Sequence, residues 1–140
     1  MNARVFETTL RVRYVETDQM GVVYHSNFLI WFEVGRVEAM RELGFDYKDM
    51  EREDGCFIAV VDARCRYRSP AYYDDRVLVR TRMTNVRGSL IHFCYEVLRA
   101  GDRTVLAEGE TTHIVTDRQM QKREIPEKYR KAFAAAVEKT

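Results

Sequence analysis

The chain has 140 residues, of which 46% are apolar and 32% charged, and its formal net charge is +1 at pH 7. This length predicts one domain over residues 1–140, with the composition of an ordinary globular protein. A net charge so close to zero gives no reason to expect nucleic acid or an anionic membrane as a partner.

The sequence shows no transmembrane or secretory segment. Its longest apolar stretch, around residues 28–32, is far too short to span a bilayer, and the N-terminus carries charges where a signal peptide has an apolar core. The three cysteines are widely spaced and form no CxxC pair, which argues against a zinc site: Cys56, Cys65 and Cys94. We therefore expect reduced thiols, a cytoplasmic location, no membrane span, no metal and no cofactor.

The first half of the chain predicts a strand, a loop and a long helix. Residues 5–14 alternate, with Phe6, Leu10, Val12 and Tyr14 on the inward face of a half-buried strand. Residues 15–25 break this period and form a loop. Residues 27–43 predict a helix that Ser26 or Asn27 caps and Gly44 ends. Apolar residues surround most of this helix, which indicates burial on nearly all sides, and the glycine at position 35 indicates close approach to a strand.

After residue 55 the pattern predicts four antiparallel strands in a meander. Their inward residues include Val61, Ala63, Cys65 and Tyr67 in the first run, Val77, Val79 and Met83 in the second, and Ile91, Phe93, Tyr95 and Val97 in the third. The fourth run spans residues 104–115. Turn residues separate the strands. Pro126 is predicted to be the first residue of a C-terminal helix that continues over 127–139. The elements predict an α+β domain, in which a five-stranded antiparallel sheet has one face covered by the long helix.

The segment Arg13-Tyr14-Val15-Glu16-Thr17-Asp18-Gln19-Met20-Gly21-Val22-Val23-Tyr24-His25-Ser26-Asn27-Phe28 carries the chemistry. It resembles the signature of the 4-hydroxybenzoyl-CoA thioesterase family of the hotdog superfamily. The resemblance is specific at Asp18, Met20-Gly21, Tyr24-His25 and Asn27-Phe28, and it is closest to the acyl-CoA thioesterase branch that includes the Tol-Pal-associated enzymes. It implies a hotdog fold, with the sheet wrapped around the long helix, and the hydrolysis of acyl-CoA thioesters.

The residues themselves fit this chemistry. Thioester hydrolysis needs a nucleophile or a base for water, and hydrogen-bond donors for the oxyanion. The loop holds Asp18 just before the helix, whose first backbone amides are unpaired and lie at the positive end of the helix dipole. We expect the amides of roughly Val23, Tyr24 and His25 to polarise the thioester carbonyl. Gly21 lets the loop turn tightly, with a positive φ.

The resemblance implies that Asp18 is the catalytic carboxylate, which either attacks the thioester or activates water. It places Tyr24 at the oxyanion site and His25 beside it, with Asn27 a weaker candidate for contact with the acyl or pantetheine end. Structural roles compete with each assignment: Asp18 as a turn former, Asn27 as a helix cap, and Tyr24 as an anchor for the loop.

Phosphates of CoA call for Arg or Lys near the pocket mouth. The candidates are Arg87 and Ser89 at a hairpin, and Lys122 and Arg123 before the last helix. Glu33 is a second candidate carboxylate, because related hotdog enzymes of another branch use an acid on this helix. A structural pairing with Arg36 or Arg64 is the competing role, and the one that we expect. His92 and His113 lie in predicted strands and have no metal-ligand spacing to each other or to His25, so we expect both to be structural.

The resemblance also implies a homodimer or homotetramer with active sites at the subunit interface, and an exposed sheet edge favours such pairing. Acyl carrier protein thioesters are a second class of substrate to consider. Two other functions compete: a hotdog dehydratase or isomerase, which usually has a histidine in a Phe-Pro-Gly context that this chain lacks, and a non-catalytic acyl-thioester-binding or scaffolding module. The intact Asp18 motif favours the thioesterase.

Overall fold

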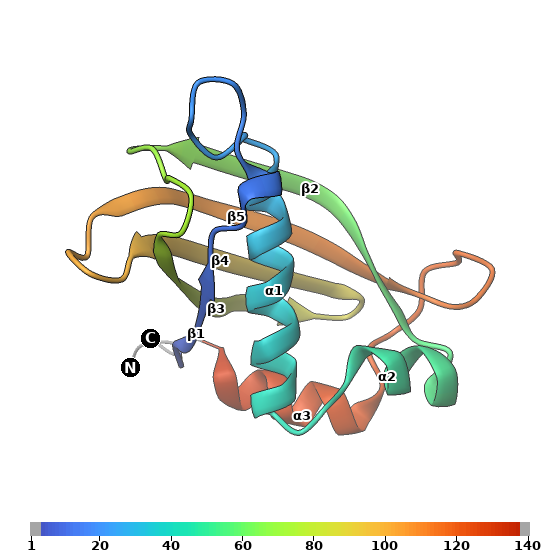
Figure 1. Cartoon of the computed structure of the whole chain (residues 1–140). Coiled ribbons are helices and arrows are strands. Elements are labelled where there is room, and N and C mark those ends of the chain that lie inside the picture. Colours follow the sequence, from blue (N-terminus) through green and yellow to red (C-terminus); the bar gives the residue numbers. More distant parts are fainter. Residues whose placement is uncertain (1–3, 138–140) are drawn as a thin grey trace.

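The computed structural model describes residues 4–137, which form a curled five-stranded antiparallel sheet with a long helix across its inner face (Figure 1). The strands are β1 (Phe6–Arg11), β2 (Phe57–Tyr67), β3 (Arg76–Arg87), β4 (Leu90–Arg99) and β5 (Val105–Thr116). The helices are α1 (Asn27–Glu42), α2 (Tyr47–Asp54) and α3 (Glu127–Ala136). This is the predicted α+β hotdog fold.

The sheet order is β1-β3-β4-β5-β2, so the prediction of a four-strand meander is only partly right. Strands β3, β4 and β5 follow one another as predicted. Strand β2 instead pairs with β5, from Phe57 opposite Thr116 to Tyr67 opposite Ala107. Tight hairpins already give β4 both of its neighbours, so the free side of β5 is where the strand that follows α2 finds a partner. One side of β2 is therefore an edge of the sheet.

Helix α1 packs on the sheet through large side chains and one glycine. Trp31 and Phe32 are fully buried, and the Phe32 ring stacks on Tyr95 with ring centroids 4.3 Å apart. A Cβ atom at Gly35 would lie 2.4 Å from Thr81 Oγ1 and 2.9 Å from a methyl carbon of Val79. The predicted close approach of this glycine to a strand is confirmed. It explains why a poor helix former stands in the middle of α1.

Three predictions about buried faces are wrong. Helix α1 is not buried on nearly all sides, because Leu29 and Ile30 are 40% and 46% exposed. Tyr14 is exposed because β1 ends at Arg11 and Tyr14 begins a 3₁₀ turn. Val61 is exposed because the register of β2 shifts between Val60 and Asp62, and one extra residue turns the side chains around.

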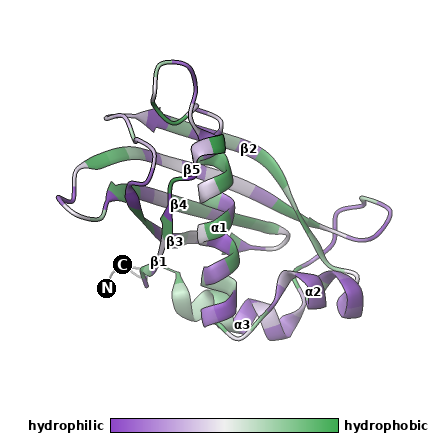
Figure 2. Ribbon diagram, in the orientation of Figure 1, coloured by the Kyte–Doolittle hydropathy of each residue, from purple (hydrophilic) through white to green (hydrophobic). Residues whose placement is uncertain are grey.

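The sequence reading missed helix α2, whose residues are mostly hydrophilic (Figure 2) and of which Met50 is buried. Its C-cap is Gly55 with a φ of 59°, and Gly44, with a φ of 96°, follows the C-cap of α1, as predicted for Gly44. Pro126 precedes α3 as its N-cap rather than as its first residue, and positions 138 and 139 of the predicted helix lie outside the described residues.

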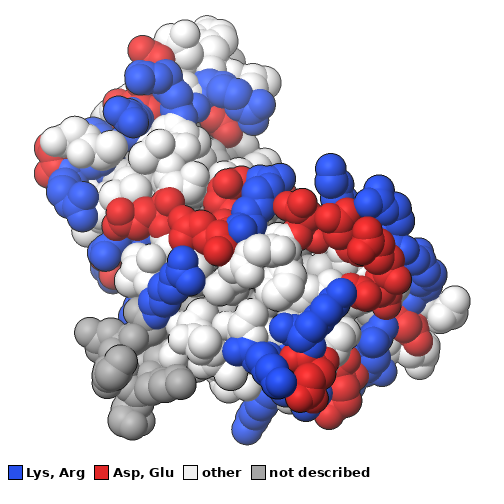
Figure 3. Space-filling model, turned by 90° about the horizontal axis from the view of Figure 1, so that it is seen from below, with Lys and Arg blue, Asp and Glu red and all other residues white. Residues whose placement is uncertain are grey.

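The surface around α2 and α3 mixes charges of both signs (Figure 3). Interspersed charges produce no broad field of one sign on this side of the molecule, in keeping with the balanced composition. Within residues 4–137, no helix is both long enough and apolar enough to cross a membrane.

Candidate active site

The motif between β1 and α1 folds into a small hairpin that presents Asp18. Thr17 and Val23 form an antiparallel bridge, and the Asp18 amide donates to the Val22 carbonyl at 2.9 Å. The Gly21 amide donates to the Asp18 carbonyl at 3.0 Å, and Gly21 has a φ of 81°. This conformation strains any residue with a Cβ, so the glycine is needed for the turn, as predicted.

The half-buried Asp18 carboxylate is oriented by its own turn. Its Oδ1 accepts a hydrogen bond from the Met20 amide at 2.8 Å. Such a bond holds an aspartate in one rotamer and leaves its second oxygen for another partner. The predicted turn-forming role and a chemical role are thus compatible in the same side chain.

Asp18, Tyr24 and His25, which were predicted to act together, line one pocket of about 460 Å³ at the start of α1. Met20 and the end of β2 also contribute, and the apolar wall is formed by Val22, Val23, Phe28, Pro70 and Ala71. A largely apolar pocket with a few convergent polar groups is typical of small-molecule sites.

Tyr67 is a pocket residue that the sequence reading did not single out. Its hydroxyl donates to the His25 carbonyl at 3.0 Å, and its ring meets Phe28 edge-on with centroids 5.3 Å apart. Burial, together with the nearby Cys65, raises the pKa of Tyr67 to about 12, so the phenol is protonated at neutral pH. The only sequence signal was its inward position at the end of the strand.

Glu16 is the second residue that was missed, and it fixes the base of the loop. Its buried carboxylate accepts hydrogen bonds from the Arg13 amide at 2.8 Å and from the Trp31 indole at 3.0 Å. Its backbone carbonyl accepts from the Tyr24 amide and the Asn27 side chain, both at 2.9 Å. One residue therefore ties the loop to the first turns of α1.

The predicted set of oxyanion donors is too large. The Val23 amide donates to the Ala71 carbonyl at 2.8 Å and the Tyr24 amide to the Glu16 carbonyl at 2.9 Å, so neither is available. Among residues 4–137, no acceptor is paired with the His25 amide, which is therefore the one unengaged amide of the three. The loop uses the other two amides to hold its own shape.

Asn27 and Glu33 do not line the pocket. The Asn27 side chain supports the loop through Glu16. Glu33 is exposed, and both of its predicted pairings are wrong: Arg36 is buried and donates to the Tyr95 hydroxyl at 3.2 Å, whereas Arg64 pairs with Asp62 at 3.3 Å.

Three of the four predicted phosphate ligands lie together, but away from Asp18. Arg87, Ser89 and Lys122 line a hollow of about 390 Å³ that also contains Glu124. The fourth, Arg123, instead donates to the Asp54 carbonyl at 3.0 Å. This hollow lies at the β3–β4 hairpin, beside the Phe57 end of β2, whereas Tyr67 at the opposite end borders the Asp18 pocket.

The two strand histidines have the structural contacts expected of them. His113 is buried and hydrogen-bonded to Thr111 at 2.8 Å, and burial near Arg36 and His92 lowers its pKa to about 3. His92 is hydrogen-bonded to Thr84 at 2.6 Å. In the part of the chain that the structure describes, no three His, Cys, Asp or Glu side chains gather as a metal site would require.

The chain is similar in sequence to known proteins. Residues 12–133 match the family described as the thioesterase-like superfamily. The chain is 32% identical to the Escherichia coli acyl-CoA thioester hydrolase YbgC, over 84% of this chain and 86% of that one. It is 38% identical to a Bacillus subtilis protein provisionally named acyl-CoA thioesterase YneP, over 92% and 90% of the two chains.

A solved structure of similar shape is the DHNA-CoA thioesterase from Staphylococcus aureus, with a TM-score of 0.89 and 28% identity over 94% of this chain and 89% of that one. None of these names tests the Tol-Pal assignment, which stays a prediction. The family match covers the loop, the long helix and every strand except β1. The chain therefore belongs to the thioesterase-like superfamily.

Proposed function

We propose that the protein hydrolyses acyl-CoA thioesters to a free acid and CoA. The observation that carries this proposal is the Asp18 carboxylate, held in a largely apolar pocket at the start of α1 that His25, with its uncommitted amide, also lines. Membership of the superfamily supports it, as do the activities in the names of YbgC and YneP.

In this mechanism Asp18 acts on the thioester carbonyl carbon by one of two routes. It either attacks directly, giving a mixed anhydride that water then hydrolyses, or takes a proton from an attacking water. In both routes the C–S bond breaks, the carbonyl carbon gains an oxygen that comes from water, and the departing CoA sulfur is protonated. The His25 amide and the positive end of α1 stabilise the oxyanion, with Tyr24 and the His25 ring beside it.

The remaining substrate contacts are proposed from the chemistry of CoA. Arg87, Ser89 and Lys122 are suited to phosphate, but they lie at the other end of the sheet from Asp18 in the same chain. They reach a CoA bound at Asp18 only if a second copy presents them, and Arg123 has to leave the Asp54 carbonyl to join them. Acyl carrier protein thioesters present the same reacting group and are a second class of substrate.

We further propose that the cytoplasmic form is a homodimer or homotetramer. Among the described residues, no strand pairs with the free edge of β2, and Val60 and Val61 of this strand are 51% and 58% exposed. If two β2 edges pair across a two-fold axis, their unpaired backbone N–H and C=O groups form hydrogen bonds and the two valines are covered. Sedimentation as a monomer at micromolar concentration would contradict this assembly.

The test of function is thiol release from a panel of short, long and aromatic acyl-CoA substrates. We expect Asp18→Asn to lose most of kcat, by about two orders of magnitude or more, because the amide neither attacks nor takes a proton. The matched control is Asp74→Asn, since Asp74 is an exposed turn residue with a φ of 70° that lines none of the hollows described above.

Retention of wild-type turnover by a folded Asp18→Asn variant would rule out the assigned role. Absence of thiol release by the wild type across the panel would favour the non-catalytic binding module. Hydration of an enoyl-CoA without thiol release would favour the dehydratase.

A further inference from the structure

We propose that the phosphates of CoA bind within a single protomer, in a hollow on the outer face of the sheet centred on Arg66. This inference rests on the proposed function, because it assigns a second part of the same substrate. It differs from the hairpin assignment, which needs a second copy of the chain.

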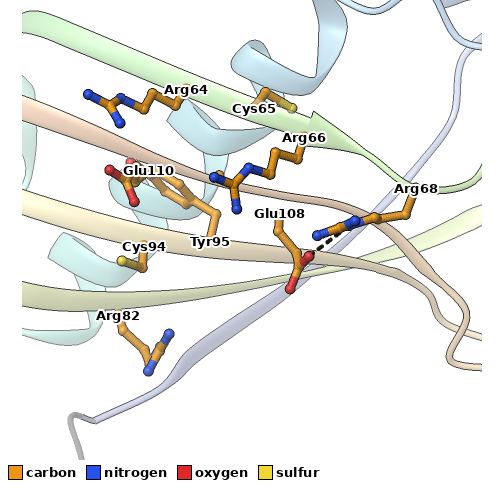
Figure 4. A pocket seen from close by; sticks show the side chains of 10 residues that line it. Arg64, Cys65, Arg66, Arg68, Arg82, Cys94, Tyr95, Glu108 and Glu110 are labelled. Carbon is orange, nitrogen blue, oxygen red and sulfur yellow. Dashed lines mark hydrogen bonds and ion pairs between the residues drawn. The ribbon is translucent and has the colours of Figure 1, made fainter.

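The hollow has a volume of about 290 Å³ and is lined by four arginines. Arg64 and Arg66 come from β2, Arg68 follows directly after it, and Arg82 lies on β3 (Figure 4). Glu108 and Glu110 of β5 are the only carboxylates among its lining residues, so arginines outnumber acids by four to two.

Strand geometry explains why these side chains share one face. Alternate residues of a strand point to the same side and are spaced by roughly 7 Å, which places Arg64, Arg66 and Arg68 in one row along the edge. Across the sheet, Arg64 is opposite Glu110, Glu110 is opposite Cys94, and Cys94 is opposite Arg82. The hollow is thus fixed by register rather than by a loop.

Arg66 is the guanidinium best placed to take a ligand. Arg68 pairs with Glu108 at 2.9 Å and Arg64 with Asp62 at 3.3 Å. Within the described chain, no carboxylate lies within ion-pair distance of Arg66, although Glu108 is its register partner. In Figure 4 its side chain extends over the middle of the hollow, between Arg64 and Glu108. A guanidinium stays charged and binds phosphate through two parallel hydrogen bonds.

The hollow and the Asp18 pocket meet at the end of β2. Arg68 lines both, and Tyr67, the residue before it, lines the Asp18 pocket. One is largely apolar around the reactive carboxylate and the other is basic, which matches a ligand with an acyl thioester at one end and phosphates at the other. The hairpin hollow shares no lining residue with the Asp18 pocket.

The experiment compares hydrolysis of an acyl-CoA with that of the same acyl-pantetheine, which lacks the phosphates. The ratio of KM for acyl-pantetheine to KM for acyl-CoA reports what the phosphates contribute. For Arg66→Ala we expect this ratio to fall about tenfold, the loss of one charge-assisted contact. Arg66→Lys keeps the charge but loses the two-pronged geometry, so its KM ratio should lie between those of the wild type and Arg66→Ala.

Two further variants make the comparison specific. Arg80→Ala is the control, because Arg80 lies on the same outer face but outside the hollow and should keep the wild-type ratio. An unchanged ratio in Arg66→Ala would overturn the inference. A fall in Arg87→Ala without one in Arg66→Ala would do the same and place the phosphates at the hairpin.

Calorimetric titration with CoA itself separates this inference from the proposed function. If the wild type releases no thiol but binds CoA, and Arg66→Ala weakens that binding about tenfold, the phosphate site stands and the hydrolytic proposal fails. If CoA binds wild type and Arg66→Ala equally well, the phosphate site is wrong whatever the turnover.

Discussion

The inner and outer faces of the same sheet accommodate polar side chains in opposite ways. On the inner face, a buried chain of contacts runs from Arg36 to Tyr95 at 3.2 Å, from Tyr95 to Thr111 at 2.6 Å, and from Thr111 to His113 at 2.8 Å. Within the described residues, the hydrogen bonds of Arg36 go to a hydroxyl and not to a carboxylate. On the outer face, Arg80 bridges Glu7 at 2.9 Å and Glu96 at 3.0 Å in contact with solvent.

Stability therefore depends mainly on the inner face, whereas the outer face is the one suited to binding. Inner polar groups are surrounded by the core, and the four residues of this chain hydrogen-bond to one another, so a change there leaves unpaired groups or cavities. Outer pairs are screened by water and contribute little to stability, so their charges remain available to ligands. The arginine hollow proposed above depends on this second property.

Removing a large side chain from the inner face should cause the greatest loss of stability. Phe32→Ala removes a fully buried ring from its stack on Tyr95 and leaves a cavity above Gly109, whose hypothetical Cβ lies 2.5 Å from Phe32 Cζ. We expect a loss of about 3–5 kcal/mol in the free energy of unfolding, measured in urea. Leu29→Ala, on the exposed side of the same helix, should cost about 1 kcal/mol or less. Equal losses would contradict the assignment of faces in α1.

The stability of the inner face should depend on pH, because His113 lies there with its pKa lowered to about 3. In the unfolded chain a histidine takes up a proton near pH 6.5, so between pH 6.5 and 3 the unfolded state binds more protons. The free energy of unfolding should therefore fall as the pH drops below 6.5, by at most about 1.4 kcal/mol per pH unit from this group.

The slope between pH 6 and 4.5, from thermal or urea unfolding, tests this assignment. His113→Gln removes the titrating group and should flatten the curve in that window, whereas His92→Gln, at a half-buried outer position, should change it less. A His113→Gln curve as steep as that of the wild type would show that other groups cause the pH dependence.

Sequence periodicity was sufficient for the fold class and for α1, because 17 residues with apolar spacing and a terminal glycine leave few alternatives. It failed at β2, whose partner depends on which edge of the sheet is free, and whose bulge at Val60 and Asp62 reverses the faces. It also failed at α2, where eight mostly hydrophilic residues give almost no apolar pattern.

The candidate site was predictable only as far as the motif extends along the chain. Asp18, Tyr24 and His25 are close in sequence, and the structure brings them to one pocket. Tyr67 reaches that pocket from a strand more than 40 residues away, and Glu16 matters through its bond to the Trp31 indole. Both depend on tertiary contacts that spacing does not encode, as does the engagement of the Val23 and Tyr24 amides.

The smallest expected effect concerns the outer face. Arg80→Ala removes two ion pairs whose side chains remain between about a third and a half exposed, so the free energy of unfolding should fall by less than about 1 kcal/mol. Because solvent-exposed pairs are screened, the difference between wild type and variant should shrink as salt rises from 0.05 to about 1 M. A loss of several kcal/mol that is insensitive to salt would mean that the outer face is buried in the assembled protein. The hollow around Arg66 would then be closed to CoA, so this measurement also bears on the phosphate site.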